Sequence, residues 1–203
     1  MALGALGLSF SVICVKTLYL HSKIAPFEVS YVSGIAVLIV MSIMAMLMGK
    51  EIIEVPKTAR FALILRGLSG FISNIFFQQS IKMISLTKQT LLFFTNPMFV
   101  ALFAWIFLKE RITKYEILQI LATFCGVILI MNPLGETTTK DTDFWHELLG
   151  SFFALLAAVF NATAMISIRK AGSSVNILMS PIYWGIFNSL LSPFMGILKA
   201  NTD

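Results

Sequence analysis

The chain has 203 residues, of which 58% are hydrophobic and 12% are charged. Soluble globular domains average about 45–50% apolar and about 25% charged residues, so this composition excludes an ordinary water-soluble domain. The formal net charge is +5, but the basic residues stand mostly at the ends of apolar stretches, where they set membrane topology and meet anionic headgroups. A lipid bilayer is therefore an expected partner, and nucleic acid is not.

Seven apolar stretches follow one another along the chain. They cover residues 2–20, 27–48, 61–81, 89–108, 112–132, 148–168 and 177–198. About twenty helical residues cross the roughly 30 Å hydrocarbon layer of a bilayer, and each stretch is about that long. We therefore predict an all-α fold, a polytopic bundle of membrane helices. The first stretch lacks a basic segment before it and a small-residue cleavage site after it, so we expect a retained helix and not a signal peptide.

Short connections and charge placement predict the topology. Residues 82–88 and 109–114 are tight connections, so we expect the third, fourth and fifth helices to be antiparallel neighbours. If the N-terminus is cytoplasmic, eight basic residues fall in inner segments: Lys50, Lys57, Arg60, Lys109, Arg111, Lys114, Arg169 and Lys170. Five fall in outer segments: Lys23, Lys82, Lys88, Lys140 and Lys199. The positive-inside rule favours this orientation; the sequence does not specify the organelle.

A weak internal repeat divides the chain. Leu3-Gly4 at the start of the first span recurs as Leu149-Gly150 at the start of the sixth. Gly34 in the second span corresponds to Gly185 in the seventh. Because five is an odd number, consecutive five-helix units enter the membrane from opposite sides, as in inverted-repeat transporters that hold substrate near the midplane. We predict a first five-helix unit over 1–132, a polar loop over 133–147, and the first two helices of a second unit over 148–203.

The third span carries a polar stripe, which we interpret as a candidate substrate-binding surface. Arg66, Gly70, Asn74 and Gln78 follow one another at a spacing of four residues, which places them on one helix face. Lipid offers such a face no partners, so it should turn towards protein or a wet cavity. Arg66 could then attract an anionic group with its planar fork of donors. Alternatively, Arg66 reaches the headgroups or pairs with loop carbonyls.

The fourth and sixth spans add further candidates. Thr95 and Asn96 precede Pro97 in the middle of the fourth span. Proline deprives the carbonyl of Phe93 of its usual donor, and this carbonyl beside an Asn side chain could bind a substrate or an ion. Alternatively, Pro97 only shapes the bundle. Asn161 in the sixth span is either a cavity residue or a hydrogen-bonding contact between helices.

Motifs for catalysis, metal binding and cofactor binding are missing from the sequence. Cys14 and Cys125 lie in predicted spans with no spacing that suggests zinc or a disulfide framework. His21 and His146 belong to no HExxH arrangement, and neither GxSxG nor a P-loop is present. We expect no catalytic residue, no metal and no cofactor.

Residues 96–113, with the sequence NPMFVALFAWIFLKERIT, resemble the signature of the EamA-type drug/metabolite transporters. Gly126-Val127 in the next helix fits the same pattern, and residues 65–68 resemble the solute carrier 35, subfamily G, branch. The resemblance implies a ten-helix carrier of small organic solutes, built from two inverted five-helix repeats with cytoplasmic termini. It marks Pro97, Glu110, Arg111 and Gly126 as structural residues, and Glu110 should fix the inner turn through salt bridges.

Our leading hypothesis is a multi-pass transporter of metabolites, amino acids or nucleotide sugars that works by alternating access. The alternatives are a membrane-embedded enzyme, for which we find no cluster of reactive residues, and a scaffold or inactive fragment without transport activity. The resemblance implies helices beyond the seventh, so we expect either a truncated chain or a homodimer that supplies the remaining helices. The sequence identifies neither the solute nor a coupling ion.

Overall fold

The computed structural model describes residues 13–19, 21, 25–47, 57–110, 113–131, 141–172 and 179–200. Within these ranges there is no strand, and residues 13–19 are helical. The longer elements are α2 (Pro26–Leu47), α3 (Lys57–Met83), α4 (Leu86–Phe93), α5 (Asn96–Phe103), the π-helical turn η1 (Ala104–Leu108), α6 (Lys114–Met131), α7 (Asp141–Ala171) and α8 (Met179–Ala200). The predicted all-α fold is confirmed.

Four segments of the described chain are long and apolar enough to cross a membrane, and they coincide with the second, third, fourth and sixth predicted spans. They are Pro26–Met44, Ala59–Met83, Leu86–Leu108 and Trp145–Ala171. Helices α6 and α8 coincide with the fifth and seventh predicted spans. The first predicted span is described only over residues 13–19. The fold is therefore that of a polytopic helical membrane protein.

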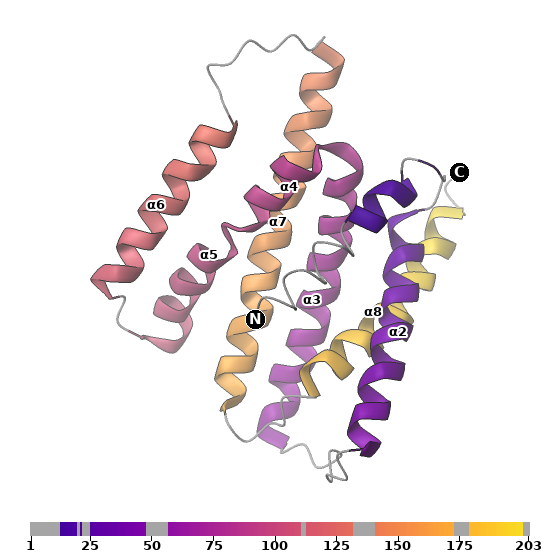
Figure 1. The fold of residues 1–203 in the computed structure, drawn as a ribbon. Coiled ribbons are helices and arrows are strands. Elements are labelled where there is room, and N and C mark those ends of the chain that lie inside the picture. The colour runs from indigo at the N-terminus through magenta and orange to yellow at the C-terminus, as the bar shows by residue number, and fades with distance from the viewer. Residues whose placement is uncertain are drawn as a thin grey trace.

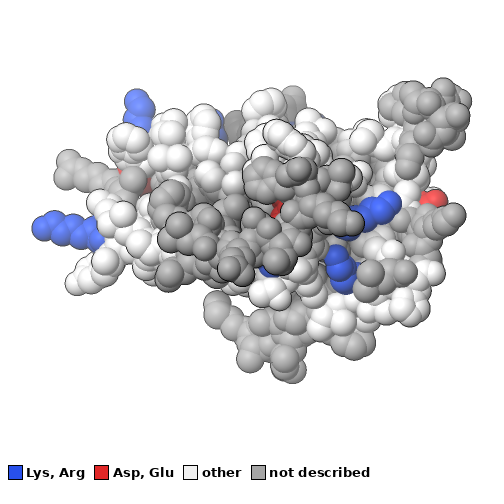
Figure 2. Space-filling view, turned by 90° about the horizontal axis from the view of Figure 1, so that it is seen from above, with Lys and Arg blue, Asp and Glu red and all other residues white. Residues whose placement is uncertain are grey.

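The distribution of side chains is the reverse of that in a water-soluble protein. Fully buried polar side chains include Ser30, Ser80, Gln89, Asn188 and Ser192. Large apolar side chains with more than half of their surface exposed include Val32, Met46, Phe61, Phe107 and Leu118. Figure 2, which looks down on one end of the bundle, shows a described surface that is mostly uncharged. Such an arrangement suits lipid outside and hydrogen-bonded contacts between helices inside.

Successive predicted spans alternate in direction, with α4, α5 and η1 together forming the fourth span, so the longer connections lie at the two ends of the bundle (Figure 1). Lys109 and Lys114 lie at the same end as Arg169, and Lys82 and Lys88 lie at the opposite end. This grouping matches the division of basic residues on which the orientation was predicted. Which end is cytoplasmic stays a prediction.

Small residues bring α3 and α7 close together. Ala154, Ala157 and Ala158 of α7 are completely buried, and the hydroxyl of Ser73 in α3 donates to the carbonyl of Ala157 over 2.7 Å. Without a hydrophobic driving force in lipid, close approach of backbones and hydrogen bonds between helices hold membrane helices together. The α3–α7 pair is therefore the centre of the bundle.

Helices α2 and α8 meet at Gly34 and Gly185, the two glycines that the predicted repeat aligns. A Cβ atom at Gly34 would lie 2.8 Å from the Cβ of Asn188, and one at Gly185 would lie 3.1 Å from the carbonyl oxygen of Gly34. Both helices therefore need glycine at this crossing. Helix α8 also crosses α3, where a Cβ at Gly67 would lie 2.3 Å from the ring of Phe187.

Helix α7 lies between most of α3 and the fourth predicted span. Helices α4 and α5 pack mainly on α7, and α6 lies at the edge of the bundle against α4 and α5 (Figure 1). The prediction that the third and fourth spans are direct neighbours is wrong for most of their length. A short connection fixes only the ends that it joins, and α7 enters between the remaining parts.

Candidate functional site

The polar stripe of α3 faces the interior of the bundle. Ser69, Ser73 and Gln78 are nearly completely buried. Asn74 is partly buried and donates through Nδ2 to Ser30 Oγ of α2 over 3.0 Å and to Asn188 Oδ1 of α8 over 2.9 Å. This single amide joins three helices.

The far end of the stripe contacts the described part of the first predicted span. The phenol of Tyr19 donates to Oε1 of Gln78 over 3.0 Å. The ammonium of Lys16 donates to the carbonyl of Ile84 over 2.8 Å and to that of Ile81. The last turn of a helix leaves its carbonyls without partners, so Lys16 satisfies two of them. These contacts close one end of the space beside α3.

A cavity of about 380 Å³ lies beside the stripe; we call it the central cavity. Gly70, Asn74 and Gln78 of the stripe line it, and α7 contributes Asn161. The other lining residues are Val15, Val29, Ser33, Ser73, Phe77, Ile81, Phe93 and Trp184. Four residues predicted to bind substrate therefore surround one space, which is within the size range of small-molecule sites.

Arg66 does not line the central cavity, but it lies beside Gly70, which does. Its Nε donates to Ser180 Oγ at the start of α8 over 3.2 Å. A Cβ atom at Gly70 would lie 2.6 Å from Arg66 Nη1 and 2.6 Å from Trp184 Cδ1, so the guanidinium fills the space that this glycine leaves. Arg66 therefore bonds to a side chain of α8, within reach of the cavity wall.

The fourth predicted span is broken before Pro97. Helix α4 ends at Phe93 and α5 begins at Asn96, with a turn at residues 94–95. Thr95 is buried, and its hydroxyl donates to the carbonyl of Leu92 over 2.7 Å. Pro97 therefore occupies the first turn of a new helix, where its missing N–H costs least. Phe93 lies on the wall of the central cavity, as stated above, but Thr95 and Asn96 do not.

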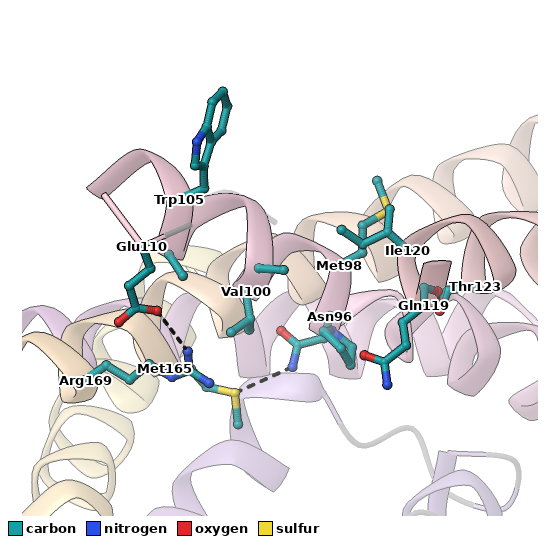
Figure 3. Close-up of a pocket in the computed structure, with 13 residues that line it drawn as sticks. Asn96, Met98, Val100, Trp105, Glu110, Gln119, Ile120, Thr123, Met165 and Arg169 are labelled. Atoms are coloured by element: carbon teal, nitrogen blue, oxygen red, sulfur yellow. Dashed lines mark hydrogen bonds and ion pairs between the residues drawn. The ribbon is translucent and has the colours of Figure 1, made fainter. Parts of the chain in front are cut away.

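Asn96 instead lines a second cavity, of about 320 Å³, between α5, η1, α6 and α7 (Figure 3). Its Nδ2 contacts the sulfur of Met165 at 3.8 Å, and its Oδ1 is buried without a hydrogen-bond partner. Glu110 and Arg169 also line this second cavity, and their charged atoms lie 3.8 Å apart. The described partner of Glu110 is thus at the end of α7. Arg111 lies outside the described residues.

The remaining predicted structural residue has an open setting. A Cβ atom added at Gly126 in α6 would meet no atom of the described residues within 4 Å, so none of these requires glycine there. Two residues near Arg66 were not predicted from the sequence, namely Ser180 and Trp184, which contact or adjoin it. Both lie far from Arg66 in the chain, and no sequence motif connects them with it. Among the described residues, no three His, Cys, Asp or Glu side chains cluster as they would around a metal ion.

Comparisons with known proteins agree on one class. The model of the EamA-like transporter family matches residues 1–132. The chain is 35% identical to human solute carrier family 35 member G1 over 133 residues, which is 64% of this chain and 36% of that protein. It is 30% identical to a pseudopaline exporter of Pseudomonas aeruginosa over 108 residues, which is 53% of this chain and 35% of the exporter.

The matched region spans only about a third of the length of these curated relatives. The match to mouse solute carrier family 35 member G1 has a similar extent, with 35% identity over 64% of this chain and 37% of the relative. No solved structure gives a significant match.

Proposed function

This chain belongs to the EamA-like transporter family, as its resemblance to the solute carrier 35, subfamily G, branch predicted, and we propose that it forms part of a carrier of small organic solutes. The solute classes that we propose are metabolites, amino acids and nucleotide sugars. The carrier works by alternating access, in which the unit over residues 1–132 moves against the unit that begins at 148. The N-terminus is cytoplasmic, and two copies of the chain associate as a homodimer.

The observation that carries this proposal is the convergence of the α3 stripe on the central cavity. Gly70, Asn74 and Gln78 line it together with Asn161 of α7, so both proposed units contribute to its wall. A space among apolar helices with several polar side chains on its wall is where a transporter of this kind would hold its cargo.

Arg66 supports a preference for solutes with an anionic group. Its guanidinium lies against Gly70 on the cavity wall, and its described hydrogen bond uses only Nε. A guanidinium carries five N–H donors, so donors remain for a carboxylate or a phosphate.

Flux into proteoliposomes tests the proposal. The purified chain would be reconstituted and supplied with a panel of radiolabelled anionic metabolites, amino acids and nucleotide sugars. We expect saturable uptake of at least one anionic solute, which falls about tenfold or more in Arg66→Leu and partly recovers in Arg66→Lys. Arg60→Leu, which removes an exposed charge from the same helix, should leave uptake unchanged. Absence of flux for every solute, or full tolerance of Arg66→Leu, would favour a scaffold instead.

A further inference from the structure

The second cavity lies further along the same face of α7 as the central cavity. Asn161 lines the central cavity, and Met165 and Arg169 line the second. These three residues follow at intervals of four, so they share one face of α7. At 1.5 Å per residue, Arg169 lies about 12 Å from Asn161 along the helix. The two cavities share no lining residue in the part of the chain that the structure describes.

Irregular backbone surrounds the second cavity. The break between α4 and α5 lies at one side, and the π-helical turn η1 contributes Ala104 and Trp105. Lys109, which follows η1, has a φ of 55° and precedes the lining residue Glu110. Such backbone is tolerated at membrane depth only where protein buries it or where it lines a wet cavity. Single π-helical turns also occur frequently at functional sites.

The polar groups of the second cavity have unused hydrogen-bonding capacity. Asn96 Oδ1 is a buried acceptor that receives no hydrogen bond from the residues that the structure describes, which is rare in folded proteins. The 3.8 Å between Glu110 and Arg169 exceeds the roughly 2.7–2.9 Å of a strong charge-assisted hydrogen bond. Both side chains are about half exposed, at 53% and 55%. The carboxylate of Glu110 and the guanidinium of Arg169 can therefore each form a hydrogen bond with a further group.

The described groups lie at two ends of the cavity (Figure 3). The Glu110–Arg169 pair is at one end, and Asn96 is at the other, beside Gln119 of α6. Among the described lining residues, Glu110 and Arg169 carry the only charges, and these cancel. A net anion would be repelled by Glu110 and a net cation by Arg169. Only a solute that carries both charges gains from both side chains.

We propose that the second cavity is a binding site for a small zwitterionic solute with a neutral hydrogen-bond donor. Its ammonium binds Glu110, its carboxylate binds Arg169, and its neutral N–H or O–H donates to Asn96 Oδ1. A volume of about 320 Å³ is near the lower end for small-molecule sites, which restricts the solute to amino-acid size. This charge requirement differs from that of the central cavity, where Arg66 favours anions. The inference goes beyond the proposed carrier function, because binding here requires no transport.

Binding of four probes to the purified full chain, measured by isothermal titration calorimetry, tests this proposal. Glutamine has both charges and an amide. Glutaramate lacks only the ammonium, 4-aminobutanamide lacks only the carboxylate, and leucine keeps both charges but lacks the amide. We expect glutamine to bind at least tenfold more tightly than each of the other three. Equal affinities, or no binding of glutamine, would overturn the proposal.

Variants assign each preference to a side chain. Glu110→Gln should abolish the preference for glutamine over glutaramate. Arg169→Gln should abolish the preference for glutamine over 4-aminobutanamide. Asn96→Leu should reduce the affinity for glutamine to that for leucine. The matched control is Glu147→Gln, which removes the carboxylate of another ion pair of α7 outside this cavity, and it should leave all four affinities unchanged. The same effect from Glu147→Gln as from Glu110→Gln would overturn the assignment.

Two further measurements separate this site from folding and from transport. The double variant E110R/R169E keeps one charge of each sign and should keep the preference for glutamine even if the single variants do not fold. Loss of that preference in the folded double variant would contradict the proposal. Binding that survives without any flux would refute the carrier function and leave this site standing.

Discussion

The crossing of α2 and α8 depends on the absence of a side chain at Gly34, so Gly34→Ala is a direct test of the packing. The added Cβ would lie 2.8 Å from Asn188 Cβ and 2.9 Å from the backbone nitrogen of Ser189. Carbon atoms pack at about 3.5–4.0 Å, so the two helices would have to separate by roughly 0.7–1.2 Å. One of these neighbours is a backbone atom, so a side-chain rotation cannot relieve the contact. Overpacking of this kind costs about 1–3 kcal/mol in the free energy of unfolding.

The chain provides two comparisons for this variant. Gly126→Ala adds the same methyl group where no atom of the described segments lies within 4 Å, and in a helix interior it should be neutral or stabilise by about 0.5–1 kcal/mol. Gly185→Ala should cost less than Gly34→Ala, because the atom nearest to its Cβ, at 2.8 Å, belongs to the flexible side chain of Leu38.

Unfolding of the purified variants in mixed micelles, titrated with sodium dodecyl sulfate and followed by tryptophan fluorescence, gives the three free energies. From the most to the least stable variant, the expected order is Gly126→Ala, then Gly185→Ala, then Gly34→Ala. If Gly34→Ala were as stable as the unmodified chain, or if Gly126→Ala lost as much stability, the close approach of α2 and α8 would be refuted.

Two other substitutions test the polar contacts in the same titration. Asn74→Leu removes a donor from the fully buried Oδ1 of Asn188 and should cost about 1–3 kcal/mol; an unchanged free energy would mean that this junction does not hold the helices. Lys88→Glu breaks the ion pair with Glu147, which is about one-third exposed and worth about 0.2–1 kcal/mol. Adding Glu147→Lys should restore the loss, and strictly additive effects of the two changes would contradict the pairing.

Hydropathy and helical periodicity were sufficient to locate the helices in the described part of the chain and to predict the inward face of α3. The apolar stretches locate helices because a backbone in lipid must satisfy its own hydrogen bonds. The stripe from Gly70 to Gln78 points inward for the same reason, since lipid offers amides no partners. Both arguments use only properties of one segment and its solvent, which a sequence contains.

Partners on other helices could not be predicted in this way. The bonds from Arg66 to Ser180 and from Glu110 to Arg169 join residues far apart in the chain, and no spacing rule selects them. The position of α7 beside α3 depends on the stripe of completely buried alanines, which looks like any other apolar run before a neighbour is known. Pro97 illustrates a local limit: it indicates a disrupted helix, but the turn at residues 94–95 decides that a new helix begins there.

The contacts that the first proposed unit makes with α7 and α8 differ in strength, and we base a last prediction on this difference. The crossing at Gly34 is close-packed, whereas the Lys88–Glu147 and Glu110–Arg169 pairs near the two ends of α7 are partly exposed and individually weak. Under the proposed alternating access, the units should therefore pivot at the close-packed crossing and open where α7 meets the fourth span. Gly34→Ala should then slow influx and efflux equally, whereas Lys88→Glu and Glu110→Gln should shift the balance between outward-open and inward-open states in opposite directions. Accessibility of cysteines placed in the two end segments measures that balance, and a shift of the same sign from both ion-pair variants would contradict this pivot.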